Sequence, residues 1–507
     1  MKERQSGVLM HISSLPGKYG IGSFGKSAYD FVDFLVRTKQ RYWQILPLGT
    51  TSYGDSPYQS FSAFAGNTHF IDFDRLVEEG LLVKSDLEGL DFGQDPRKVD
   101  YAKVFNNRRP VLEKAVKRFL ERGDLAAYEK FVADNVSWLE VFVEYMAIKE
   151  YFDLKAWTEW PDAAVRHREA SSLATYREKL ADRLTYHRVT QYLFFKQWLE
   201  LKNYANEHHI EIVGDMPIYV AADSCDVWAQ PHFFKTDALG QPTCVAGCPP
   251  DEFSATGQLW GNPIYDWKAM DEDGYSWWIE RLRESFKIYD VVRIDHFRGF
   301  ESYWEIPAGS DTAAPGKWVK GPDYALFKAV KEELGELNII AEDLGFMTDE
   351  VIALREKTGF PGMKVTQFAF NPESESIDSP HLAPNNSVMY TGTHDNNTVL
   401  GWYRDEIDDA TREYMAQYTN RKEYETVPHA MLRTIFASVS FMAIATMQDL
   451  LELDGSARMN YPSSIGGNWS WRMTADELDP VIEAELYSLT KTYRRLNKKL
   501  LKKENEL

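Results

Sequence analysis

The segment "VVRIDHFRGF" (residues 291–300) places an arginine, an aspartate and a histidine within and just after an apolar run. Side chains alternate along a strand, so Arg293 and Asp295 share one face. Val292 and Ile294 then point to the opposite face. Because burying a charge is costly, a strand of this kind must give that charge a partner or a function.

Seven other short apolar segments end in polar residues, as this one does. With 291–297, the set comprises 7–15, 42–49, 211–220, 338–345, 363–370, 387–395 and 444–451. Most are separated by helix-like stretches, and the clearest of these are 26–40, 323–336 and 348–359. Strands that alternate with helices indicate parallel βαβ units, and eight such units predict an α/β fold with a closed (β/α)₈ TIM barrel.

The spacing of these strands predicts one catalytic barrel, residues 1–507, with insertions. The gap between the second and third strands is far longer than one crossover needs, and about 75–205 has helical spacing throughout. A second insertion is expected at about 222–280, the substrate loop region, and a third at about 400–440. The tail after the eighth strand has the pattern of a closing helix.

The composition is that of a globular protein without a membrane span. Hydrophobic residues make up 44% and charged residues 26%, and no apolar run approaches the length needed to cross a bilayer. The N-terminus does not have the pattern of a secretory signal. Three cysteines, Cys225, Cys244 and Cys248, cannot form a disulfide framework, so a cytoplasmic location is expected. No second Cys or His cluster follows at zinc spacing, so no metal site is predicted.

The net charge argues against nucleic acid and membrane as partners, and the aromatic content favours a sugar. A net charge of −20 repels nucleic acid and anionic membrane but suits a neutral substrate. Aromatic residues make up 14%, with 15 Trp and 27 Tyr. Tyr and Trp combine an apolar ring with a polar edge, which matches the two kinds of surface on a sugar.

Four of the predicted strands deliver a carboxylate at or near their ends: Asp215, Asp295, Glu342 and Asp395. In a parallel barrel, catalytic groups lie at the C-terminal strand ends. A capped turn or a buried salt bridge would explain any single one, but four at equivalent positions favour catalysis. No G-x-S-x-G elbow and no P-loop is present. Paired carboxylates instead suit glycosidic chemistry, in which one is the nucleophile and the other a general acid.

The neighbours of these carboxylates suggest their charge states. Arg293 lies two residues before Asp295 on the same face and is expected to keep it ionised. Glu342 has no basic neighbour in sequence, so an apolar pocket near Asp295 would raise its pKa towards that of a proton donor. Asp395 and His394 are expected to hydrogen-bond sugar hydroxyls, although a lone histidine is more often structural.

The motifs around these residues resemble those of known families. "VVRIDHFRGF", "AEDLG" and "TGTHDNNT" resemble signature strands of the α-amylase superfamily. The loop motifs at 52–67, 245–267 and 467–472 are more specific. They resemble the amylomaltase family of 4-α-glucanotransferases, the disproportionating enzymes of glycoside hydrolase family 77. The resemblance runs from "ISSLPG" near the N-terminus to "GNWSWR", almost the whole chain.

The resemblance implies a (β/α)₈ barrel with helical insertions and no separate C-terminal β-domain. It implies that Asp295 is the nucleophile, Glu342 the acid/base and Asp395 the third carboxylate. The substrate-binding positions implied by matching motifs are Arg293, His394, Asp215, Tyr58, Trp260 and Asn468. The sequence departs at Glu252, where many relatives carry an aromatic residue, and Phe253 is the candidate substitute.

The implied reaction transfers α-1,4-glucan segments to the 4-hydroxyl of an acceptor sugar by a retaining double displacement, with no cofactor and no metal. Two alternatives stay open. An α-glucan hydrolase on the same barrel would share the residues of bond cleavage. A non-catalytic glucan-binding barrel would be expected to lack one of the three carboxylates. The sequence does not set chain-length preference, cyclisation or oligomeric state.

Overall fold

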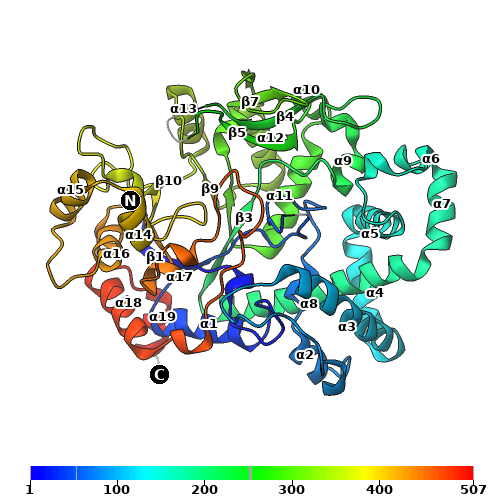
Figure 1. Ribbon diagram of the computed structural model, residues 1–507, viewed down its shortest axis with the longest axis horizontal. Helices are drawn as coiled ribbons and strands as arrows, with labels where there is room; N and C mark the ends of the chain where they lie inside the picture. The colour runs from blue at the N-terminus through cyan, green and yellow to red at the C-terminus, as the bar shows by residue number, and fades with distance from the viewer. Residues whose placement is uncertain (1, 53, 251–253, 506–507) are drawn as a thin grey trace.

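The computed structural model describes residues 2–52, 54–250 and 254–505. At its centre lies a closed eight-stranded parallel barrel (Figure 1). Around the barrel the strand order is β1-β12-β11-β10-β9-β6-β3-β2. In chain order the strands are β1 (Gln5–Leu9), β2 (Tyr42–Gln44), β3 (Glu211–Met216), β6 (Val291–Ile294), β9 (Ile339–Ala341), β10 (Gly362–Val365), β11 (Ser387–Tyr390) and β12 (Met442–Thr446). Each predicted apolar segment overlaps one of these strands, so the predicted barrel is confirmed.

The two faces of β6 differ as the alternation predicts. Val291 packs inside the barrel in a core with residues from the other strands, among them Val213, Ile340 and Tyr390. Val292 and Ile294 belong to the outer core, between the barrel and its helices. The interior is therefore a packed core that supports the groups at the strand ends.

Helices cover the outside of the barrel. Three of them begin and end close to the predicted bounds: α1 (Lys26–Arg37), α12 (Tyr324–Leu334) and α13 (Asp349–Thr358). Others are α11 (Ser276–Ile288), α16 (Val427–Ala437), α18 (Pro480–Thr492) and α19 (Lys498–Asn505). Between β10 and β11 a 3-10 turn, Thr366–Ala369, and irregular chain replace the usual helix. None of the helices in the described part of the chain is both long and apolar enough to cross a bilayer.

A group of helices lies between β2 and β3 and forms the lobe on the right of Figure 1. Its members are α2 (Phe73–Glu78), α3 (Tyr101–Arg122), α4 (Leu125–Asp134), α5 (Val136–Tyr151), α6 (Ala163–Arg166), α7 (Ala170–Lys179) and α8 (Ala181–Glu207). The longest, α8, packs against α3, α4 and α5 and leads directly back to β3. It therefore joins the lobe to the barrel.

A second, antiparallel sheet has the strand order β5-β4-β7-β8. Its strands are β4 (Cys244–Cys248), β5 (Gln258–Pro263), β7 (Ser302–Pro307) and β8 (Lys317–Lys320). The sequence did not predict this sheet. Two of its strands come before β6 and two after it, so the pairing of β4 with β7 joins distant parts of the chain.

Candidate active site

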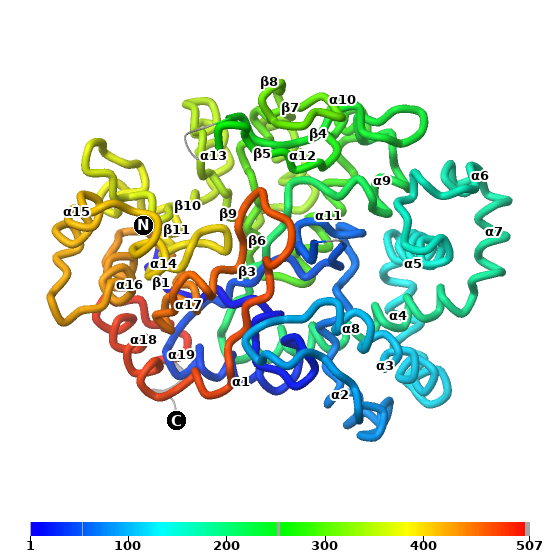
Figure 2. Tube along the Cα trace, viewed as in Figure 1, coloured from blue at the N-terminus to red at the C-terminus, as the bar shows by residue number. Residues whose placement is uncertain are grey.

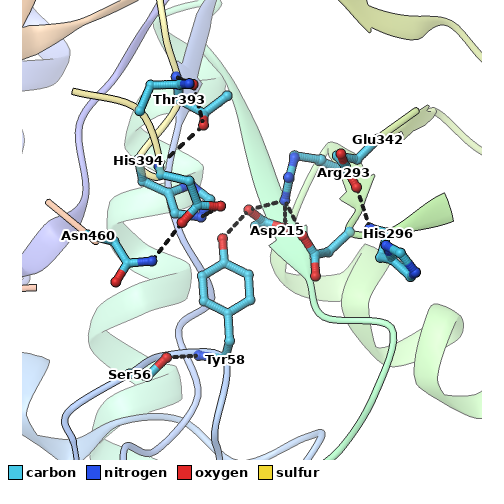
Figure 3. Close-up of polar contacts among 12 residues, drawn as sticks. Ser56, Tyr58, Asp215, Arg293, His296, Glu342, Thr393, His394 and Asn460 are labelled. Carbon is cyan, nitrogen blue, oxygen red and sulfur yellow. Dashed lines mark hydrogen bonds and ion pairs between the residues drawn. The ribbon is translucent and has the colours of Figure 1, made fainter. Parts of the chain in front are cut away.

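The four strand-end carboxylates meet at one end of the barrel. Asp215 lies within β3, Asp295 directly follows β6 and Glu342 directly follows β9. Asp395 is in the loop after β11. Because the barrel strands are parallel, their C-terminal ends all lie on the same side, and Figure 3 shows two members of the group, Asp215 and Glu342, in the region around Arg293.

Arg293 links two of these carboxylates (Figure 3). Its Nη1 atom lies 2.7 and 2.8 Å from the two oxygens of Asp215 and 3.2 Å from Oδ1 of Asp295. Burial raises the pKa of Asp295 to about 6, although Arg293 acts to lower it. The sequence predicted the contact with Arg293. The effect of burial on the pKa is larger than that of Arg293, so Asp295 ionises at a higher pH than the charge of Arg293 alone would give.

Glu342 is held by two backbone amides. The N–H of His296 donates to Oε2 at 2.6 Å, and the N–H of Leu344 donates to Oε1 at 3.2 Å. Burial raises the pKa of Glu342 to about 8, with a further increase from Asp295 and an opposing effect of Arg293. Burial therefore favours the protonated form of Glu342, which is the state that a general acid needs.

Asp395 is held in the ionised state by its neighbours. Nε2 of His394 lies 3.3 Å from Oδ2, and the amide of Asn460 donates to Oδ1 at 2.7 Å. Burial opposes ionisation, but His394 and Asn460 lower the pKa of Asp395 below its usual range. Asp395 in turn raises the pKa of His394 against the effect of burial. The pair can offer a carboxylate acceptor to a sugar hydroxyl.

Tyr58 forms one wall of the site. Its hydroxyl donates to Oδ2 of Asp215 at 2.7 Å, and its ring stacks on His394 with the centroids 5.1 Å apart. The ring of Trp469 lies 5.7 Å from the rings of both Tyr58 and His394. Figure 2 shows the segment that carries Trp469, in orange, crossing the centre of the molecule. Aromatic rings from loops that are far apart in the chain thus line one side of the four carboxylates.

Trp260 and Asn468 are the remaining described residues that the sequence predicted to bind substrate. Trp260, on β5, packs edge to face on the ring of His296, with the centroids 4.8 Å apart. Asn468 is buried, and its amide accepts from the N–H of Tyr461 at 3.0 Å and donates to Oγ of Ser464 at 3.0 Å. The amide of Asn468 folds the loop that presents Trp469. Glu252 and Phe253 lie outside the described residues.

Sequence reasoning gave no role to His296 or Asn460. The backbone of His296 has φ +49°, an uncommon conformation for a non-glycine residue, and the turn directs its N–H to Glu342. Asn460 reaches Asp395 from a loop 65 residues further along the chain. No periodicity marks either residue, because both act through loop geometry. Within the described ranges, no group of three or more His, Cys, Asp or Glu side chains could hold a metal ion.

A (β/α)₈ barrel with paired carboxyl groups at its strand ends, one of which holds its proton to a higher pH than the other, is an arrangement of enzymes that act on glycosidic bonds. The fold and the site define the protein as a member of that class. Comparisons with known proteins narrow the class further. The family model described as 4-alpha-glucanotransferase, glycoside hydrolase family 77, matches residues 10–478.

Relatives match over nearly the whole chain. A 4-alpha-glucanotransferase of Streptococcus pneumoniae is 80% identical over 501 residues, which is 99% of both chains. One of Clostridium butyricum is 47% identical over 488 residues, 96% of this chain and 100% of the relative. The amylomaltase of Streptococcus agalactiae, solved in complex with acarbose, superimposes with a TM-score of 0.96 at 51% identity, covering 98% of this chain and 100% of that one.

The chain belongs to the 4-alpha-glucanotransferase family, the amylomaltases of glycoside hydrolase family 77. It is an enzyme that transfers glucosyl units, as the resemblance of its motifs implied. The family acts on α-1,4-glucans.

Proposed function

We propose that Asp295 and Glu342 carry out transfer between α-1,4-glucans by a retaining double displacement. The observation that supports this assignment is the difference between the two acids. Burial raises the pKa of Asp295 to about 6 and that of Glu342 to about 8, so Glu342 keeps its proton to a higher pH than Asp295 does. A nucleophile needs the ionised state and a general acid the protonated one.

In the first step a carboxylate oxygen of Asp295 attacks the anomeric carbon of the donor. The glycosidic bond breaks, and Glu342 gives its proton to the departing oxygen, so that the reducing-end fragment leaves. Asp295 is then covalently bound to the donor sugar, and Glu342 is ionised. Asp395, ionised by its contacts with His394 and Asn460, accepts hydrogen bonds from hydroxyls of the distorted sugar ring.

In the second step the 4-hydroxyl of an acceptor sugar replaces water. Glu342 removes its proton, the oxygen attacks the anomeric carbon, and the bond to Asp295 breaks. Both steps invert, so the α-configuration is retained, which requires the two carboxyl groups to lie about 5–5.5 Å apart. Transfer exceeds hydrolysis when the acceptor is held and water is excluded. The rings of Tyr58, Trp260 and Trp469 around the carboxylates support a role of these residues in binding the acceptor and excluding water.

The proposed substrates are maltooligosaccharides and fragments of starch or glycogen. These are neutral, which suits a chain of net charge −20, and neither nucleic acid nor membrane is proposed as a partner. The proposed compartment is the cytoplasm, because Cys225 and Cys244 are buried free thiols, as a reducing environment keeps them. Since the S. agalactiae amylomaltase is solved with acarbose, we propose acarbose as a competitive ligand of this site.

Incubation with maltotriose tests the reaction. Transfer gives a ladder of longer and shorter glucans plus glucose, whereas hydrolysis gives only shorter products. Asp295→Asn keeps the shape of the site and removes the nucleophile, so transfer should fall by at least about a thousandfold. Wild-type product formation by Asp295→Asn would remove Asp295 from the mechanism, and a product set without longer glucans would favour the hydrolase.

A further inference from the structure

Two large aromatic side chains remain exposed near Glu342. Phe346 is 64% exposed, and Trp318, on the edge strand β8, is 38% exposed. Phe346 follows Glu342 by four residues, and four residues of chain span at most about 14 Å. Single exposed apolar residues need no explanation, so the case for these two rests on the contacts that fix them near the site.

A buried arginine contacts the backbone of Phe346 and the ring of Trp318. Arg298 is 4% exposed, and its Nη1 atom donates to the backbone oxygen of Phe346. The same guanidinium lies over the ring of Trp318, 3.9 Å from its centroid, and its Nη2 atom donates to Oγ of Ser302 at 3.1 Å. The loop after Glu342 and the edge of the second sheet are thus fixed to each other through one side chain.

The second sheet also restrains Trp318 from the side. Trp304 is its direct partner across β7 and β8, and the two rings meet at 70° with centroids 5.2 Å apart. Nε1 of Trp304 donates to the oxygen of Ala313 at 2.8 Å, which fixes that ring in turn. A ring held in place before binding loses little conformational entropy when a ligand packs on it.

The two aromatic residues are connected to the acid end of the site. The N–H of Phe297, the residue before Arg298, donates to the backbone oxygen of Glu342 at 3.0 Å. In the proposed function Glu342 protonates the leaving oxygen and later activates the acceptor hydroxyl. The departing fragment and the incoming acceptor therefore occupy the side of the site on which Glu342 lies.

We propose that Phe346 and Trp318 form an accessory binding site for the acceptor α-1,4-glucan, beyond the sugar unit that reacts. The proposal rests on the proposed function of Glu342. Aromatic rings offer flat apolar surfaces that match the C–H faces of glucose units, and no charged group is needed to bind a neutral chain. The site makes a long acceptor better than a short one without changing the chemistry of the bond.

The test compares acceptors of different length. Radiolabelled glucose and radiolabelled maltopentaose are offered with a fixed starch donor, and the ratio of their kcat/KM values as acceptors is measured for wild type, Phe346→Ala and Trp318→Ala. Loss of one stacking ring should lower the preference for maltopentaose by about fivefold in each variant. Phe346→Tyr keeps a ring and should keep the wild-type ratio.

Tyr424→Ala is the matched control, because Tyr424 is 90% exposed and lies between α15 (Asp409–Thr419) and α16. It should leave the ratio and the activity unchanged. Phe346→Ala decides the question if Trp318→Ala fails to fold, since the exposed ring of Phe346 can be removed without opening a core. An unchanged ratio in Phe346→Ala overturns the accessory site. That result would leave the proposed function intact, whereas full transfer by Asp295→Asn would overturn the proposed function itself.

Discussion

The backbone N–H of His296 donates a hydrogen bond of 2.6 Å to the carboxylate of Glu342. Asp295 is the residue directly before His296, so this bond fixes the proposed acid relative to the proposed nucleophile through one peptide unit. The bond favours the ionised form of Glu342, whereas burial favours the protonated form and is the larger effect. Glu342 can therefore hold a proton at neutral pH and release it without moving away from the nucleophile.

The pKa values of the two acids predict a bell-shaped pH profile of kcat/KM. The active form has Asp295 ionised and Glu342 protonated, so activity should fall below about pH 6 as Asp295 gains a proton. It should also fall above about pH 8 as Glu342 loses one. Initial rates of maltotriose transfer between pH 4.5 and 9.5 measure both limbs. Below about pH 6 and above about pH 8, kcat/KM should fall roughly tenfold for each pH unit.

A donor whose leaving group needs no proton tests whether the alkaline limb of the pH profile is due to Glu342. With an α-glycosyl fluoride the leaving group departs as fluoride, so the first step should no longer depend on Glu342. Fluoride release by Glu342→Gln should then be far closer to wild type than its transfer from maltotriose, which should fall about a hundredfold or more. Equal losses with both donors would contradict the assignment of Glu342 as the acid.

Arg293→Gln should shift the acid limb of the profile to higher pH. The guanidinium lowers the pKa of Asp295, so its removal leaves burial and the charge of Asp215 to raise that pKa further. The variant also leaves Asp215, which is 2% exposed, without its cation. Breaking a buried ion pair in this way should cost about 3–5 kcal/mol of unfolding free energy, measured by urea denaturation.

The double variant Arg293→Gln/Asp215→Asn separates the two effects. It removes both charges, so most of the lost stability should return, because the buried carboxylate is no longer uncompensated. Activity should stay low, because Asp295 still lacks the guanidinium. A double variant as unstable as Arg293→Gln alone would show that the loss came from packing and not from charge.

Tyr58→Phe should weaken the site without removing the ring that stacks on His394. The hydroxyl of Tyr58 donates to Asp215 at 2.7 Å, and a hydrogen bond to a charged group contributes about 1.5–3 kcal/mol. We expect a loss of that size in unfolding free energy and a smaller change in KM than Tyr58→Ala gives. Tyr424→Phe, at a position 90% exposed, is the control and should change neither quantity.

The barrel could be predicted from the sequence because its strands are apolar on both faces and end in polar groups. The second sheet could not, because two of its strands, "CVAGC" and "QLWGNP", contain a glycine, and because the pairing of β4 with β7 spans β6. Their hydrogen bonds depend on where β6 brings the chain. Pattern alone does not supply that information.

The residues of the site also fall into two kinds, those at strand ends, which the sequence predicts, and those on loops, which it does not. Asp295 and Glu342 stand at strand ends, so their meeting follows from the parallel barrel. Asn460 and the backbone of His296 contribute through loops, where spacing carries no periodic signal. The charge on Asp295 was predicted from Arg293 alone, and burial, which a local sequence does not reveal, proved the larger effect on its pKa.

Replacement of Arg495 should lower the stability of the fold without acting on the active site. It lies after α18, is fully buried, and donates to the backbone oxygens of Phe436 at 2.7 Å, Gln5 at 2.9 Å and Ser440 at 3.0 Å. It thereby joins the tail of the chain to the start of β1 and to the loop before β12. Arg495→Met keeps most of the volume but removes these hydrogen bonds, at a cost of about 3–5 kcal/mol.

The neighbouring residue provides the matched control for this change. Arg494 is exposed, so Arg494→Met makes the same substitution one position earlier and should stay within about 0.5 kcal/mol of wild type. Denaturation by urea measures both variants, and transfer from maltotriose at a temperature where Arg495→Met remains folded should be close to wild type. Because the hydrogen bonds of Arg495 go to α16, to the loop before β12 and to the start of β1, and to none of the site residues, a loss of transfer in the folded variant would mean that the closing tail acts on the site through the barrel.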